Sequence, residues 1–187
     1  MNVAFETLHP GFAAMRDYLT GLQSRSQTGR RMPRRADLDP AAFRDLLAFV
    51  NLIDVVLEMD AVRFRFRLVG TAQSEAAQLH YAGRFVDDVV DPASRPRVLE
   101  DLTRVVATCR PHYGRYGMPF PGRGFIDSER VFYPLSTDDR MVDCILALHH
   151  YPDLAPTPRP GESEVGAQAS MAQDWHLDAW RQAVGAE

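Results

Sequence analysis

The chain has 187 residues, of which 45% are hydrophobic and 25% charged, and this is typical of one globular domain with tails. Its net charge of −4 argues against a nucleic-acid-binding module, which needs a basic excess. All 21 basic residues are arginine, so the sequence has no lysine for Schiff-base chemistry and no P-loop.

The N-terminal third predicts a helix, a connector and a second helix. Apolar residues recur every three or four positions over 10–23, which favours an amphipathic helix. The segment 24–36 is polar and contains five arginines; we expect a hydrated connector, with contact to an anionic partner as the alternative. A second helix is predicted over 39–49, because Asp39 is a typical N-cap and Pro40 fits the first helical position.

Two strands follow, over 50–59 and 62–69. In the second, apolar side chains alternate with Arg63, Arg65 and Arg67, so one face is expected to be buried and the arginine face exposed. The short gap between the two runs predicts an antiparallel hairpin.

The middle of the chain predicts helices, and the last third predicts strands. A short helix is expected over 72–80, an irregular segment over 83–94, and a longer helix over 93–110 with Pro96 in its first turn. Three strands are then expected, over 112–120, 125–135 and 141–151. The last strand is apolar on both faces, which indicates a central, covered position.

From residue 152 the composition becomes rich in proline and poor in core residues, which indicates a tail. Near the end Trp175, Leu177 and Trp180 lie in a short amphipathic stretch, and we expect it to form a terminal helix that docks on this domain or on a partner. The predicted organisation is an N-terminal helix and connector over 1–32, a domain over 33–151, and the tail over 152–187.

The order of elements predicts an α+β fold. If the five strands form one sheet, it is antiparallel, with the helices on one face and an N-terminal helix in addition. Apolar runs are too short for a transmembrane helix, and the first residues do not have the pattern of a secretory signal, so we expect a cytoplasmic protein that does not bind a membrane.

Four stretches resemble a family of small bacterial single-domain PAS-like proteins. They are PRRADLDPAAFRDLLAFVNLIDVV (33–56), FRFRLVGT (64–71), AGRFVDDVV (82–90) and ERVFYPLSTDDRMVDCILA (129–147). The resemblance implies a PAS-like fold with a five-stranded antiparallel sheet. It also implies a sensory or protein-interaction module of signal transduction that binds a small molecule between sheet and helices, forms a homodimer, or acts on a partner signalling protein. It implies no particular cofactor, and the cysteine motif of photoactive flavin adducts is absent.

The cavity implied by the resemblance has aromatic candidates, because ligand pockets are mostly apolar with a few polar groups. Arg84 is a further candidate, either for a ligand carboxylate or for pairing with Asp87 or Asp88. We therefore predict a small apolar or amphipathic ligand, with plain core packing as the alternative. The predicted site residues are Phe66, Tyr81, Arg84, Phe85, Tyr116 and Phe132.

Catalytic and metal-binding roles are not predicted. His149 and His150 are neighbours at a strand end, where side chains point to opposite faces, so a structural or solvent-facing role is expected. His80 and His112 flank the helical middle, and a haem ligand remains the alternative there. Cys109 and Cys144 are expected to be buried, inert thiols. Two other functions stay open: a small isomerase- or dehydratase-type enzyme on a similar curved sheet, and an interaction protein with a filled core.

Overall fold

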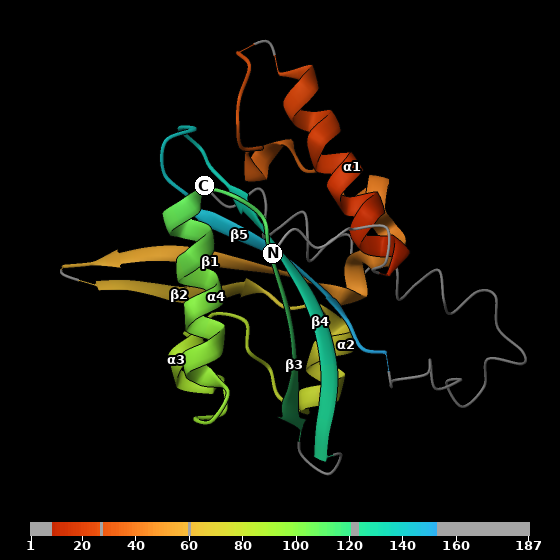
Figure 1. Ribbon diagram of the computed structural model, residues 1–187, viewed down its shortest axis with the longest axis vertical. Coiled ribbons are helices and arrows are strands. Elements are labelled where there is room, and N and C mark those ends of the chain that lie inside the picture. The colour runs from red at the N-terminus through yellow and green to blue at the C-terminus, as the bar shows by residue number, and fades with distance from the viewer. Residues whose placement is uncertain (1–8, 27, 60, 121–123, 153–187) are drawn as a thin grey trace, which may run out of the picture.

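The computed structural model describes residues 9–26, 28–59, 61–120 and 124–152. Five antiparallel strands form one sheet in the order β2-β1-β5-β4-β3, with the last strand of the sequence in the middle (Figure 1). The strands are β1 (Val50–Glu58), β2 (Ala61–Leu68), β3 (His112–Phe120), β4 (Gly124–Leu135) and β5 (Cys144–His150). The predicted α+β class, the hairpin and the central position of the last strand are confirmed.

The helices lie close to their predicted positions, with two differences in type. They are α1 (Pro10–Arg25), η2 (Arg35–Asp37), η3 (Pro40–Phe49), α2 (Thr71–Ala77), α3 (Val86–Val89) and α4 (Arg95–Thr108). The predicted helix over 39–49 is a 3₁₀ helix that kinks at Phe43, although Asp39 caps it as expected by accepting from the backbone N–H of Ala41. The irregular segment over 83–94 includes the single turn α3.

The strand expected over 141–151 begins later, at Cys144, because a tight turn comes first. The carboxylate of Asp138 accepts from the backbone N–H groups of Arg140 and Met141, and Asp139 adopts a left-handed conformation with φ of 62°. Such Asx turns compete with strand pairing for the same backbone groups.

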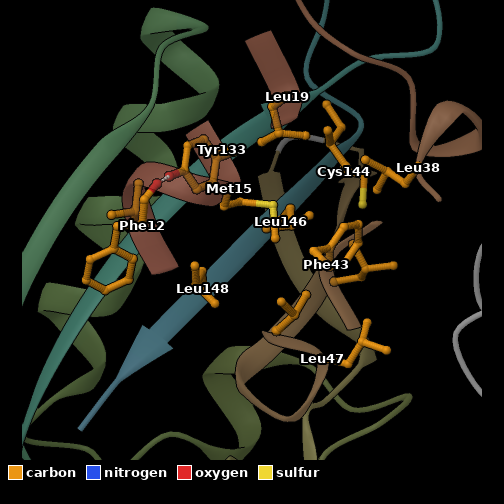
Figure 2. Close-up of a cluster of buried hydrophobic side chains, with 14 residues drawn as sticks. Phe12, Met15, Leu19, Leu38, Phe43, Leu47, Tyr133, Cys144, Leu146 and Leu148 are labelled. Carbon is orange, nitrogen blue, oxygen red and sulfur yellow. Dashed lines mark hydrogen bonds between the residues drawn. The ribbon is translucent and has the colours of Figure 1, made fainter. Parts of the chain in front are cut away.

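Helices cover both faces of the sheet. We call the face toward α1 the outer face and the face toward α4 the inner face. On the outer face, α1 inserts Phe12, Met15 and Leu19 into an apolar core formed with η3 and alternate residues of β1, β4 and β5 (Figure 2). Its other buried members are Leu38, Phe43, Leu47, Val50, Leu52, Val131, Tyr133, Leu135, Cys144, Leu146 and Leu148.

On the inner face, α4 buries Val98, Leu102 and Val105, which are spaced by four and three residues and so form one stripe. They pack on the strand residues that alternate with those of the outer core. The strand residues and their neighbours in this core are Met32, Ile53, Phe64, Phe66, Val86, Phe132, Val142, Ile145 and Ala147. The second strand therefore alternates as predicted, with Phe64 and Phe66 buried.

Gly70 joins β2 to α2 at a point of close backbone approach. A Cβ atom at this position would lie 2.3 Å from the carbonyl oxygen of Ala48. Only glycine, which has no Cβ atom, avoids this clash. This contact brings the start of α2 against the end of η3. In α2, Gln73 contacts Asn51 of β1, and Ala76 and Ala77 pack with Ile126 of β4 and with Tyr151, which follows β5.

Candidate functional site

A group of buried polar side chains lies on the inner face of the sheet beneath α2. Asn51 of β1 is 1% exposed, Gln73 of α2 is 8% exposed and His149 of β5 is 5% exposed. The amide nitrogen of Asn51 donates to Gln73 Oε1 and lies 3.0 Å from His149 Nε2, while its oxygen accepts from the backbone N–H of Gly70 at 2.9 Å. We call Asn51, Gln73 and His149, with Arg130, the polar cluster.

These contacts fix the tautomer of His149. The Asn51 amide nitrogen is a donor with two hydrogens, so His149 Nε2 must accept and the ring proton resides on Nδ1. Burial and the charge of Arg130 keep the pKa of His149 well below its usual value, so the imidazole is neutral. The Nδ1–H group is buried and has no partner among the described residues; the other such side-chain atom is Asp101 Oδ2 on α4.

Arg130 brings a positive charge into the same region. It is 3% exposed on β4, and its Nε donates to the hydroxyl of Ser128 at 3.0 Å. Its charge lowers the pKa of His149 and opposes the burial that raises the pKa values of Tyr81 and Tyr151, that of Tyr151 to about 12. The ring of Tyr151 stacks on His149 with centroids 6.2 Å apart. The polar cluster therefore presents hydrogen-bond donors in a positive potential.

Three of the six predicted site residues lie on the inner face. Phe66 and Phe132 are 4% and 2% exposed in its apolar core, and Phe66 stacks on Tyr81 with centroids 5.5 Å apart. Tyr81 also packs near Ala76, Ala77 and Tyr151, so its ring lies between the apolar core and the region of the polar cluster.

The other predicted residues lie elsewhere or outside the described part. Phe85 pairs with Arg65 at the edge of β2, and the guanidinium of Arg63 covers its ring at 3.7 Å from the centroid. Arg84 is exposed, and it is Arg63 that binds Asp87, at 2.7 Å. The side chain of Tyr116 lies outside the described residues. The predicted aromatic set is thus split between the inner core and the edge of the sheet.

Two pockets among the described residues lie outside the inner core. One, of about 570 Å³, lies at the connector after α1 and is lined by residues such as Arg25, Arg30 and Arg34. The other, of about 420 Å³, lies beside β1 and β2 and is lined by residues such as Asp54, Arg65 and Arg67. The described residues contain no group of three or more His, Cys, Asp or Glu side chains placed to hold a metal ion. None of the described helices is long and apolar enough to span a bilayer.

Sequence reasoning did not select Asn51, Gln73, Arg130 or His149. The available signal was a polar residue inside each of three apolar strands, at Asn51, Arg130 and His149. Alternation along a strand predicts which face of the sheet such a residue occupies. The order of the strands decides whether the three residues lie close together. The prediction that His149 and His150 face opposite ways is confirmed, because His150 stacks on His9 on the outer side, with centroids 4.0 Å apart.

Comparison with known proteins gives one family and several similar folds. Residues 9–149 match the family described as PAS domain. A LOV protein of Rhodobacter sphaeroides is 14% identical over 80% of this chain and 93% of its own, with a TM-score of 0.46. The PAS domain of BvgS from Bordetella pertussis is 17% identical over 68% of this chain and 83% of its own, with a TM-score of 0.42. No curated protein matches the chain.

Proposed function

Because this chain belongs to the PAS-domain family of sensory and interaction modules in signalling, we propose that it senses a small molecule on the inner face of its sheet. The proposed site lies between the polar cluster and the Phe66–Tyr81 pair, beneath α2. The observation that supports it is the buried His149 Nδ1–H group, which has no partner among the described residues.

An unsatisfied buried donor costs about 1–3 kcal/mol, and most buried polar groups in folded proteins are paired. An apolar residue at position 149 would avoid this cost. A neutral histidine there, oriented by Asn51 and next to the buried charge of Arg130, is suited to a group that accepts hydrogen bonds.

The ligand in this proposal is an amphipathic molecule with an acceptor or anionic head, such as a small carboxylate. Its head accepts from His149 Nδ1–H and faces Arg130, since charge-assisted hydrogen bonds are about twice as strong as neutral ones. Its apolar part lies against Phe66, Tyr81 and Phe132. This ligand belongs to the amphipathic class predicted from the sequence. Its polar end is bound by residues that the sequence analysis did not select.

Entry to the site requires α2 to move. This helix has only seven residues, and hydrogen bonds from Asn51 to Gln73 and from Gly70 to Asn51 tie its start to β1. A ligand that competes for Asn51 or His149 displaces Gln73, and the resulting shift in the population of α2 positions is the signal passed to a partner signalling protein.

A homodimer remains part of the proposal, but not through the apolar stripe of the first helix. Phe12, Met15 and Leu19 are buried against the sheet of their own chain. A second copy therefore has to use another surface or exchange α1.

An interaction module with a filled core is the second candidate function. It is favoured by the complete burial of Phe64, Phe132 and Leu102 on the inner face and by the position of both pockets elsewhere. In neither candidate does a residue have a catalytic role.

The test is native mass spectrometry of freshly purified protein, followed by thermal unfolding with a series of aliphatic and aromatic carboxylates. A ligand at 100 times its Kd stabilises the folded state by about 2.7 kcal/mol, which raises the Tm by several degrees. We expect this shift in the wild type and its loss in His149→Phe. The matched control is His150→Phe, which changes the neighbouring residue on the other face.

A wild-type protein without added mass, whose Tm no carboxylate raises, would favour the filled-core interaction module. Equal shifts in the wild type and in His149→Phe would place the ligand elsewhere. Gln73→Leu is the second variant, because it removes an α2 contact of the polar cluster and leaves the strands intact.

A further inference from the structure

The pocket at the end of α1, which we call the connector pocket, is formed by the last turns of α1, the connector and η2. Its volume of about 570 Å³ is within the range of about 300–1,000 Å³ that is usual for small-molecule sites. Figure 1 shows the connector running back beside α1 toward η2. Its charged lining residues are three arginines and one carboxylate, which gives the lining a net charge of +2: Arg25, Arg30, Arg34 and Asp37.

Two of these arginines are held in place by acceptors of the protein itself. Arg34 donates from Nε and Nη2 to the carboxylate of Asp37, with the shortest contact at 2.7 Å. Arg30 donates from Nε to the carbonyl of Met32 and from Nη2 to two carbonyl oxygens of the β4–β5 turn. In both arginines, Nη1 forms no hydrogen bond with another described residue. Each oriented guanidinium therefore keeps one amino group that can donate to a ligand.

The single carboxylate of the lining is matched by one of the arginines. The hydrogen bond from Arg34 lowers the pKa of Asp37, so this group is ionised at neutral pH. Its negative charge pairs with Arg34, and the lining contains no other carboxylate for Arg25 and Arg30. The positive excess therefore lies between the end of α1 and the connector.

Arg25 is the third arginine, and its guanidinium has no acceptor. It is exposed in the last turn of α1 and forms no hydrogen bond or ion pair within the described part of the chain. The guanidinium lies along α1, because its Nη1 is 3.6 Å from the position that a Cβ atom of Gly21 would take. The hydroxyls of Ser26 and Thr28 also line the pocket and bond to each other at 3.0 Å. One of these two hydroxyls still has a hydrogen to donate.

This set of donors suits a phosphate monoester. Such a group carries a charge of about −1.5 to −2 at pH 7 and has three strong acceptor oxygens, and the planar fork of arginine matches phosphate geometry. The C-terminal end of a helix has a negative potential that disfavours anions, so binding has to come from the side chains. Leu22 supplies an apolar wall beside them for the carbon part of an ester.

We propose that the connector pocket binds a small phosphate monoester between Arg25, Arg30 and Arg34. The phosphate oxygens accept from the three guanidinium groups, and the carbon part of the ester lies against Leu22. Because Arg30 also binds the β4–β5 turn, the occupied pocket links the end of α1 to that turn. The pocket shares no residue with the polar cluster, so this inference does not depend on the proposed function.

Isothermal titration calorimetry of the full-length protein with phenyl phosphate and with inorganic phosphate, at constant ionic strength, tests the proposal. We expect one saturable site with a Kd of about 1 mM or lower. Arg25→Glu should weaken both probes by about tenfold or more, because a hydrogen bond to a charged group is worth at least that factor. Leu22→Ala should weaken phenyl phosphate alone, so the ratio of the two affinities should fall toward one.

Arg84→Glu and Arg110→Glu are the matched controls, because they make the same charge change at exposed positions that do not line the pocket. Neither should change the two Kd values, and neither should His149→Phe, which tests the separate ligand of the proposed function. Absence of saturable binding at about 10 mM of either probe would overturn the proposal. Unchanged binding in Arg25→Glu would also overturn it, as would equal weakening by Arg25→Glu and by the controls, which would indicate a general attraction of anions.

Discussion

The two faces of the sheet differ in what holds their covering helices. On the outer face, α1 is fixed by buried apolar side chains, and Tyr133 adds a single hydroxyl that donates to the Phe12 carbonyl (Figure 2). On the inner face, α4 packs on apolar residues, whereas α2 is tied to the sheet through Asn51 and Gln73. Apolar packing has no directional requirement, but a polar contact can be exchanged for a ligand's. This difference is the reason why we propose the α2 end as the part of the molecule that responds to a ligand.

Phe12→Ala should have the largest effect, because it removes a fully buried aromatic ring from the outer face. Phe→Ala changes in a core cost about 3–5 kcal/mol. We expect the urea midpoint to fall by the corresponding amount, while Thr20→Ala, at an exposed position of α1, leaves it near the wild-type value. A loss below about 1 kcal/mol would mean that α1 contributes little to the fold.

Asn51→Ala should lower the free energy of unfolding by less than Phe12→Ala, but its effect should be concentrated in α2. It leaves the Gly70 N–H, Gln73 Oε1 and His149 Nε2 without their partner. At the lower end of the cost of an unsatisfied buried group, about 1 kcal/mol each, the total is about 3 kcal/mol. Hydrogen exchange should accelerate at Gly70 and in the backbone of α2 well before that of α1. In Phe12→Ala the order should reverse. Equal acceleration of both helices in both variants would remove the proposed distinction between the two faces.

The apolar cores of both faces were predictable. The spacing of Phe12, Met15 and Leu19 identified the buried stripe of α1 on the outer face, and alternation identified Phe64 and Phe66 as core on the inner face, because burial follows from a period within one element. The late start of β5 depends on the local hydrogen bonds of Asp138, and the kink at Phe43 is a local backbone conformation; a period reveals neither.

The candidate site was predictable only in its apolar half. Phe66, Tyr81 and Phe132 come from elements that the family resemblance already placed on one face. The polar half needs Asn51, Arg130 and His149 to meet across three strands. Their meeting depends on β5 lying between β1 and β4, with Asn51 paired to Ala147. The sequence around each residue does not indicate the order of the strands. In the sequence, the members of the polar cluster therefore look like three unrelated polar residues.

The free energy of unfolding should also depend on pH through His149 on the inner face, and this effect is smaller than those of the two substitutions above. His149 has a pKa of about 6.5 in the unfolded chain and well below that when folded, so below pH 6.5 the unfolded state binds a proton that the folded state does not. Stability is therefore lost as the pH falls below 6.5, by up to about 1.4 kcal/mol per pH unit, or about 2 kcal/mol by pH 5.

Urea unfolding at pH 7, 6 and 5 measures this effect. His149→Phe should remove most of the loss between pH 7 and 5, and the remainder is assigned to the half-buried His150, whose pKa is also lowered, by burial and by His9. An unchanged pH profile in His149→Phe would show that His149 takes up a proton as readily in the folded protein as in the unfolded chain, and the argument that burial keeps the imidazole neutral would fail with it.

Tyr133→Phe should have the smallest effect and tests how far the outer face depends on polar contacts. The Tyr133 hydroxyl donates to the Phe12 carbonyl at 3.0 Å, and that carbonyl belongs to the first turn of α1, where a helical N–H also reaches it. Removing the hydroxyl therefore leaves no acceptor unsatisfied and keeps the buried ring, so we expect a loss of about 1 kcal/mol in urea unfolding. Tyr113→Phe is the matched control, since its hydroxyl binds Glu129 at 2.9 Å in a half-buried position. A loss from Tyr133→Phe as large as that from Phe12→Ala would show that α1 is held by a directional contact, and the two faces would then differ in composition but not in the way they hold their helices.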